Sequence, residues 1–229
     1  MRQMSKIHPK ENLMNNIILR GVIRDIAFSH TINGVQYNKA NLIVARGDGK
    51  EDVISLKFKA ETNPYHEDEL ITISGNVRSY SHKEANGHNK VDIYVFTYFD
   101  KIEVDDDSPY INKVYIDGKI CKLSEIQDNG FSKKRIHYII ANNIESASKK
   151  VVLNAYLPCI SWGEVAEQVA NCKVSDSLQI CGSLHSREYI KKHPDGSEEF
   201  KVAHELLINE IVPINESVTS DVAEENNNS

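Results

Sequence analysis

The chain has 229 residues and a mass of 25.9 kDa, a size that allows one large domain or two small ones. Its composition, 40% hydrophobic and 26% charged, is ordinary for a soluble globular protein. No apolar run approaches the roughly 18 residues that a membrane span needs, and the first residues lack the apolar core of a signal peptide. We therefore expect a cytoplasmic protein with no membrane partner.

Lysines and arginines number 27 against 33 aspartates and glutamates, so the formal net charge is −6. Four of the acidic residues and none of the basic ones stand in 216–229, which leaves 27 basic and 29 acidic residues, a charge of −2, in 1–215. A nearly neutral body can still present a basic groove, because the local field acts on a partner more than the net charge does. Charge alone therefore leaves the class of partner open.

The sequence repeats itself in three blocks that keep their order. The blocks are 15–23 with 112–120 at an offset of 97, 42–45 with 138–141 at 96, and 71–77 with 178–184 at 107. The offset between the copies increases by about ten residues, and this increase falls between the third and fourth predicted strands. The three blocks therefore predict two copies of one domain, with an insertion in the second. Chance similarity between short apolar strands is the alternative.

Each copy contains five short segments rich in Val, Ile, Tyr and Phe, and turn signals such as Asn33-Gly34 bound several of them. The predicted strands are 16–24, 37–46, 52–59, 70–80 and 91–100 in the first copy, and 112–122, 135–142, 150–160, 178–189 and 200–211 in the second. After the third strand of the second copy, apolar residues recur with helical spacing over 162–170. The first copy has Pro64 at the same place, so we expect little or no helix there.

Five strands with a helix between the third and the fourth have the order of an OB-fold barrel. We therefore predict an all-β protein with one short helix, built as two tandem five-stranded OB-fold barrels. The first, more divergent domain spans 12–104 and the second spans 110–214. Residues 215–229 are acidic and rich in asparagine, so they are expected to form a disordered tail.

The four cysteines, Cys121, Cys159, Cys172 and Cys181, contain no C-x-x-C pair. This spacing indicates neither a disulfide framework nor a zinc site, so reduced thiols are expected. The chain also lacks a P-loop, a G-x-S-x-G pattern and an H-E-x-x-H pattern, and its nine histidines are scattered. We predict that the protein is not an enzyme and that it has no cofactor and no metal.

Aromatic and basic residues stand together on the predicted strands of the second copy. Unpaired bases stack on aromatic rings while cations follow the phosphates, so this combination is typical of proteins that bind single-stranded nucleic acid. The aromatic candidates are Tyr156, Trp162 and Tyr189, and the basic candidates around them are Arg135, Lys149, Lys150, Arg187, Lys191 and Lys201. Core packing is the alternative for each ring.

Two segments of the second copy resemble bacterial single-stranded DNA-binding proteins (the SSB family). Residues 156–170 contain W-G-x-x-A-E, and residues 182–189 fit G-x-L-x-[ST]-R-x-[YW]. The resemblance covers most of 110–214 and implies base-stacking rings at Tyr156, Trp162 and Tyr189. A further aromatic residue of the family, near the end of the second strand, has no equivalent here, because 142–144 read Asn-Asn-Ile.

The first copy keeps less of the resemblance, since the W-G-x-x-A-E helix is missing. Tyr80 is matched to Tyr189, and Phe58 is the counterpart suggested for Trp162, with core packing as an equal alternative. Arg78 is a candidate for contacts with phosphates.

These features predict a protein that binds single-stranded DNA without strong sequence preference, and that coats and protects the strand during replication, recombination or DNA transfer. A protein-interaction scaffold that has lost strand binding and a single-stranded RNA-binding protein are the alternatives. The resemblance also implies a homodimer that displays four OB folds. Most family members end in an apolar tip that recruits replication and repair enzymes; this chain ends Glu225-Asn-Asn-Asn-Ser229, which leaves such partners uncertain.

Overall fold

The computed structural model describes residues 14–62, 65–83, 87, 89–101, 108–128, 130, 133–145, 152–192 and 196–214. The first five strands are β1 (Asn15–Ile32), β2 (Val35–Ala45), β3 (Glu51–Lys59), β4 (Leu70–Lys83) and β5 (Asn89–Lys101). The other five are β6 (Asn112–Leu123), β7 (Arg135–Glu145), β8 (Val152–Trp162), β9 (Ser177–Lys192) and β10 (Glu198–Pro213). The single α-helix in this part of the chain, α1, spans Gly163–Ala170, and a 3₁₀ turn, η1, spans Ala60–Thr62.

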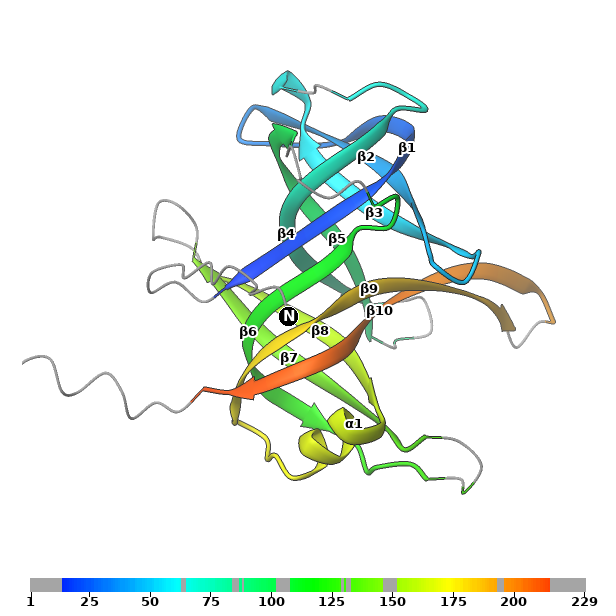
Figure 1. Ribbon diagram of the computed structural model, residues 1–229. Coiled ribbons are helices and arrows are strands. Elements are labelled where there is room, and N and C mark those ends of the chain that lie inside the picture. Colours follow the sequence, from blue (N-terminus) through cyan, green and yellow to red (C-terminus); the bar gives the residue numbers. More distant parts are fainter. Residues whose placement is uncertain are drawn as a thin grey trace, which may run out of the picture.

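Each set of five strands closes on itself, one above the other in Figure 1. Pairing in the first set runs β2–β3–β5–β4–β1 and returns to β2, and the second set repeats this order as β7–β8–β10–β9–β6. All pairs are antiparallel except β3–β5 and β8–β10. The predicted all-β fold with one short helix is confirmed, and the two closed rings are what the tandem-barrel prediction requires.

The two rings, here called the first and second barrels, are joined along β1 and β6. These strands pair antiparallel from Asn15 opposite Ile116 to Leu19 opposite Asn112, so all ten strands belong to one sheet. Figure 1 shows β1 and β6 side by side between the two barrels. The seam is symmetric under the repeat. Asn112 is the residue equivalent to Asn15 and Leu19 is the residue equivalent to Ile116, so replacing each residue of the first pair by its equivalent gives the last pair.

The internal repeat is also visible in a pair of hydrogen bonds that each barrel forms. Asn15 Nδ2 donates to the Val77 carbonyl (2.9 Å) and its Oδ1 accepts from the Val77 amide (2.8 Å). Asn112 makes the same two bonds to Leu184, at 2.7 and 2.9 Å. Because buried polar groups are placed where they find partners, this shared clamp supports a true repeat over chance similarity.

The strand registers correct the sequence alignment of the two copies. In the first barrel Leu42 pairs with Ile23, and in the second barrel Ile140 pairs with Ile120, the residue equivalent to Ile23. Leu42 is therefore equivalent to Ile140 and not to Tyr138, as the sequence alignment had it. Following the pairing from strand to strand gives offsets between the two barrels of 98 for β2, 103 for β3, 107 for β4 and 111 for β5. The length difference is therefore spread over all four connections, and the expectation of one insertion between the third and fourth strands was wrong.

The core of each barrel lies inside the ring, where alternate residues of every strand are buried. Close packing of neighbouring strands also requires glycine. A Cβ on Gly75 would stand 2.4 Å from the Phe96 carbonyl oxygen, and one on Gly182 would stand 2.1 Å from that of Leu207. These equivalent glycines let β4 and β9 pack against their neighbours without a collision.

The helix prediction for 162–170 is confirmed, since α1 buries Ala166 and Val169 against the second barrel. Between β3 and β4, the described residues of the first barrel contain only the short η1. Where the structure describes the chain, it contains no helix long and apolar enough to cross a membrane.

Candidate nucleic-acid interface

Strand β8 carries Tyr156 and Trp162 on the outside of the second barrel. Pro158 does not interrupt the strand, because it stays in register opposite Ile139. Leu157, Cys159 and Ser161 are therefore buried, while Tyr156 is 43% exposed and Trp162 is 37% exposed. Both rings are available to a ligand on the same outer surface.

Basic residues lie beside Trp162 and Tyr189. Arg135 of β7 stands opposite Trp162, with its guanidinium 5.7 Å from the ring centre. On β9, the Arg187 guanidinium is 5.8 Å from the ring of the half-buried Tyr189. A cation over an aromatic face is attracted to it and remains close to any phosphate beside a stacked base. We call the outer surface of Arg135, Tyr156, Trp162, Arg187 and Tyr189 the second face.

The remaining basic candidates differ in their surroundings. Lys191 and Lys201 both lie on the β9–β10 hairpin, where Lys201 stands opposite Tyr189 and forms an ion pair with Glu199 (3.3 Å). Lys149 and Lys150 lie outside the described residues.

A groove of about 1010 Å³ lies where the second face meets the loop between β2 and β3 of the first barrel. Trp162 and Ile160 line it from β8, and Arg187 lines it from β9. The loop contributes Arg46 and Lys50, but Asp48, Glu51, Glu188 and Glu205 line the groove as well. The groove thus combines an exposed indole with charges of both signs, rather than forming a purely basic channel.

The first barrel has its own surface of aromatic and basic residues, of which the sequence analysis named Arg78 but none of the rings. Lys57 Nζ lies 4.1 Å from the centre of the Tyr94 ring, and the Arg78 guanidinium lies 4.0 Å from that of Phe96. Tyr37 packs near Phe96, with ring centres 6.2 Å apart. We call this outer surface of β2, β3, β4 and β5 the first face.

Two features extend or modify the first face. His30 of β1 stacks on Tyr37, with ring centres 5.0 Å apart and planes within 10°. Burial lowers the pKa of Lys57, against the attraction of Asp92 and with a further decrease from Lys39. A half-buried cation of this kind is already partly desolvated, which lowers the cost of bringing a phosphate against it.

The position of Phe58 favours the core alternative. Its side chain is fully buried and meets Tyr65 edge-on, with ring centres 5.1 Å apart. The register places Lys59, not Phe58, at the position equivalent to Trp162. Phe58 as a stacking residue was therefore wrong, because the strand alternation directs it into the barrel.

Tyr80 is exposed, but its match to Tyr189 was also wrong. Counting from the equivalent Gly75 and Gly182 places Tyr80 at the position of Arg187 and His82 at that of Tyr189. Tyr80 is 59% exposed and stacks on His82, with ring centres 5.6 Å apart. Arg78 belongs to the first face as described above.

A signal for the first face is present in the sequence. Tyr37 and Lys39 alternate with the buried Ala40 and Leu42 on one strand, and Tyr94 and Phe96 alternate with the buried Val95 on another. With the correct strand parity these rings are assigned to the outside.

In the part of the chain that the structure describes, the cysteines and the acidic residues form no second kind of site. All four cysteines are free, and burial raises the pKa of the Cys159 thiol well above its usual range. No group of three or more His, Cys, Asp or Glu side chains among the described residues could hold a metal ion.

Comparisons with known proteins agree with this architecture. No family model and no curated protein matches the sequence. Among solved structures, the chain is similar to the wild-type single-stranded DNA-binding protein of Thermus aquaticus, with a TM-score of 0.65 and 14% identity over 90% of this chain and 95% of that one. A deletion mutant of the same protein gives a TM-score of 0.66 and 15% identity over 91% and 98%. The chain therefore has the fold of this single-stranded DNA-binding protein.

Proposed function

We propose that this protein binds single-stranded DNA. The observation that carries the proposal is the second face, where Tyr156 and Trp162 expose their rings, Arg135 lies beside Trp162 and Arg187 lies beside Tyr189. Exposed rings on a barrel surface stack with unpaired bases, and each stack contributes roughly 1–3 kcal/mol of binding free energy. The similarity in fold to a single-stranded DNA-binding protein supports the same proposal.

The binding is expected to be tolerant of sequence. Every base has an aromatic face, so stacking and phosphate contacts do not distinguish one base from another. A protein of this kind coats and protects a strand during replication, recombination or DNA transfer, without catalysing a reaction on it.

The first face is proposed to take part in the same binding. Its rings Tyr37, Tyr94 and Phe96 and its cations Lys57 and Arg78 provide the same two kinds of contact as the second face. A strand long enough to reach both barrels then gains affinity from the second contact, because that contact is intramolecular.

The direct test compares matched oligonucleotides of DNA, RNA and duplex DNA in a filter-binding assay. We expect tight binding of single-stranded DNA that weakens with salt by about 0.7 log units per log unit of salt for each phosphate neutralised. Equal or tighter binding of RNA would assign the protein to RNA instead. No binding of any strand at low salt would favour the protein-interaction scaffold.

We also propose that the protein forms a homodimer that displays four barrels. Light scattering at micromolar concentration should then give about twice the 25.9 kDa chain mass. A particle of one chain mass would contradict this assembly while leaving strand binding intact.

A further inference from the structure

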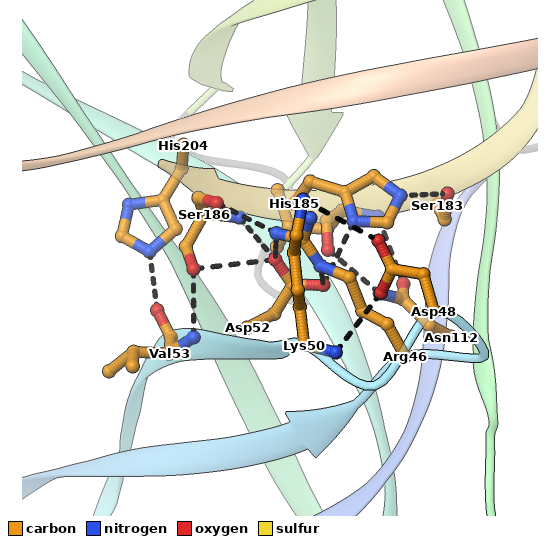
Figure 2. A network of polar contacts seen from close by, with 11 residues as sticks. Arg46, Asp48, Lys50, Asp52, Val53, Asn112, Ser183, His185, Ser186 and His204 are labelled. Carbon is orange, nitrogen blue, oxygen red and sulfur yellow. Dashed lines mark hydrogen bonds and ion pairs between the residues drawn. The ribbon is translucent and has the colours of Figure 1, made fainter. Parts of the chain in front are cut away.

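The two barrels are held together by a buried carboxylate as well as by the β1–β6 seam. Asp52 of β3 is fully buried and accepts hydrogen bonds from three residues (Figure 2). Arg46 Nε donates to it at 2.8 Å from the first barrel. From the second barrel, the Ser186 amide donates at 2.6 Å and His185 Nδ1 lies at 2.8 Å. We call Arg46, Asp52, His185 and Ser186 the Asp52 cluster.

Further hydrogen bonds connect the two barrels beside the Asp52 cluster. Arg46 Nη2 bonds to Asp52 and also donates to the Ser186 carbonyl (2.8 Å). The Val53 amide donates to Ser186 Oγ, and the Val53 carbonyl accepts from His204 Nε2, each at 2.8 Å. These bonds form a second line of contact, between β3 and the strands β9 and β10, away from the seam between β1 and β6.

The charge state of Asp52 follows from its partners. Burial by itself would raise the pKa of this carboxyl, but the hydrogen bonds from His185, Arg46 and the Ser186 amide outweigh it and lower the pKa to about 2. The carboxylate is therefore ionised at neutral pH, and His185 Nδ1 is the donor in their hydrogen bond.

The repeat shows that a barrel does not need this carboxylate in order to close. The register places Ala155 of the second barrel at the position of Asp52, and Ala155 is buried as well. One hydrogen bond of the junction is present twice, since the Tyr156 amide donates to Ser79 Oγ (2.8 Å) as the Val53 amide does to Ser186. The carboxylate and its cations are thus an addition on one side of the molecule, where the two barrels meet.

We propose that Asp52 is a positioning residue that fixes the orientation of the first face relative to the second. A two-strand seam leaves the barrels able to twist about it, because strand pairs accommodate a range of twist. The contact between β3 and β9 restricts that freedom on one side of the seam, and the bond from Tyr156 to Ser79 restricts it on the other. Asp52 adds its ionic contacts to the first of these. The cluster also sets the position of the loop after β2, since Arg46 belongs both to the cluster and to the wall of the groove that contains Trp162.

This inference rests on the proposed strand binding and predicts an effect that depends on strand length. A strand of about eight nucleotides occupies one barrel, and one of about thirty reaches both. If the faces lose their fixed orientation, the long strand loses part of the affinity that its second, intramolecular contact adds. The short strand contacts one barrel only, so its affinity does not change.

The experiment measures the Kd of oligo(dT) of both lengths for the wild type, Asp52→Ala and Asp176→Ala. Asp52→Ala copies the residue that packs at the equivalent place in the second barrel, so the variant is expected to fold. Asp176 is the control, because it is an exposed aspartate that belongs to neither face, does not line the groove and accepts a hydrogen bond from the Lys173 amide (2.7 Å). We expect Asp52→Ala to weaken binding of the long strand about tenfold or more and to leave the short strand within about twofold. Asp176→Ala should change neither.

Each outcome separates this inference from the function on which it rests. If the wild type binds neither strand, the proposed function fails. If Asp52→Ala weakens both lengths equally, or neither, the positioning role is overturned and Asp52 is a structural residue only. Should Asp52→Ala not fold, as judged by circular dichroism, His185→Gln removes a partner from the second barrel while the carboxylate stays in place. An unchanged ratio of long-strand to short-strand affinity in His185→Gln would also overturn the inference.

Discussion

At the scale of single residues, the direction of each side chain decides whether an aromatic ring belongs to the core or to the interface. Phe58 and Trp162 lie near the ends of equivalent strands, yet Phe58 is fully buried and Trp162 is exposed. They differ by one position in register, and a shift of one residue moves a side chain to the opposite face of a strand. The resemblance to a known family identified Trp162, but it could not supply the parity of a divergent copy.

Replacing single rings of the second face tests this assignment. Tyr156→Ala and Tyr189→Ala are each expected to weaken binding of single-stranded DNA by about 1–3 kcal/mol, the range of one base–aromatic stack. Melting temperatures should change little, since neither ring is part of the buried core. Tyr110→Ala, which removes another exposed ring from a connecting segment, is the control and should bind normally. Unfolding of both variants would instead assign the two tyrosines to core packing.

At the scale of elements, the sequence was sufficient for the strands and the helix but not for their exact correspondence. All ten predicted strands occur, nine of them within three residues of their predicted bounds, because short alternating segments between turn signals are a strong local pattern. The alignment of 42–45 with 138–141 was two residues out, since short apolar strands resemble one another at several offsets. β1 continues to Ile32 rather than ending near residue 24, as its outer part pairs with β2 in a hairpin.

The contact between β3 and β9 could not be predicted from the sequence, because its partners stand more than 130 residues apart. The strand alternation gives Asp52 the same inward direction as the buried Ile54 and Leu56, but the local pattern does not identify its partners. The same reason hides the first face, whose rings come from β2 and β5 and meet only after the barrel has closed.

This junction predicts a dependence of stability on pH. The pKa of Asp52 is about 2 in the folded protein and 3.8 in the unfolded chain, so its contribution is fully present above pH 4 and is lost as the pH falls through 2. The difference corresponds to about 2 kcal/mol of unfolding free energy. Urea unfolding should therefore show that the difference in unfolding free energy between wild type and Asp52→Asn is smaller at pH 2 than at pH 5 by about that amount. A difference that is the same at both pH values would contradict the lowered pKa. Asp48→Asn is the control, because it removes an exposed carboxylate of the neighbouring loop.

At the scale of the whole molecule, two copies of one barrel are joined about a symmetric seam but differ in what they present. The second face offers an exposed indole in a groove shared with the first barrel. On the first face, a cationic group lies about 4 Å from the centre of each of the rings of Tyr94 and Phe96. Under the proposed function, a strand that contacts both faces would meet two different surfaces.

The most direct test of the central claim uses the only tryptophan in the chain. A base that stacks on an indole quenches its fluorescence, so titrating poly(dT) should quench Trp162 emission strongly and saturably, with partial reversal by salt. Duplex DNA should quench much less, because its bases are already stacked. Emission that no strand of DNA or RNA changes at low salt would contradict the account, and equal quenching by duplex would contradict the preference for single strands.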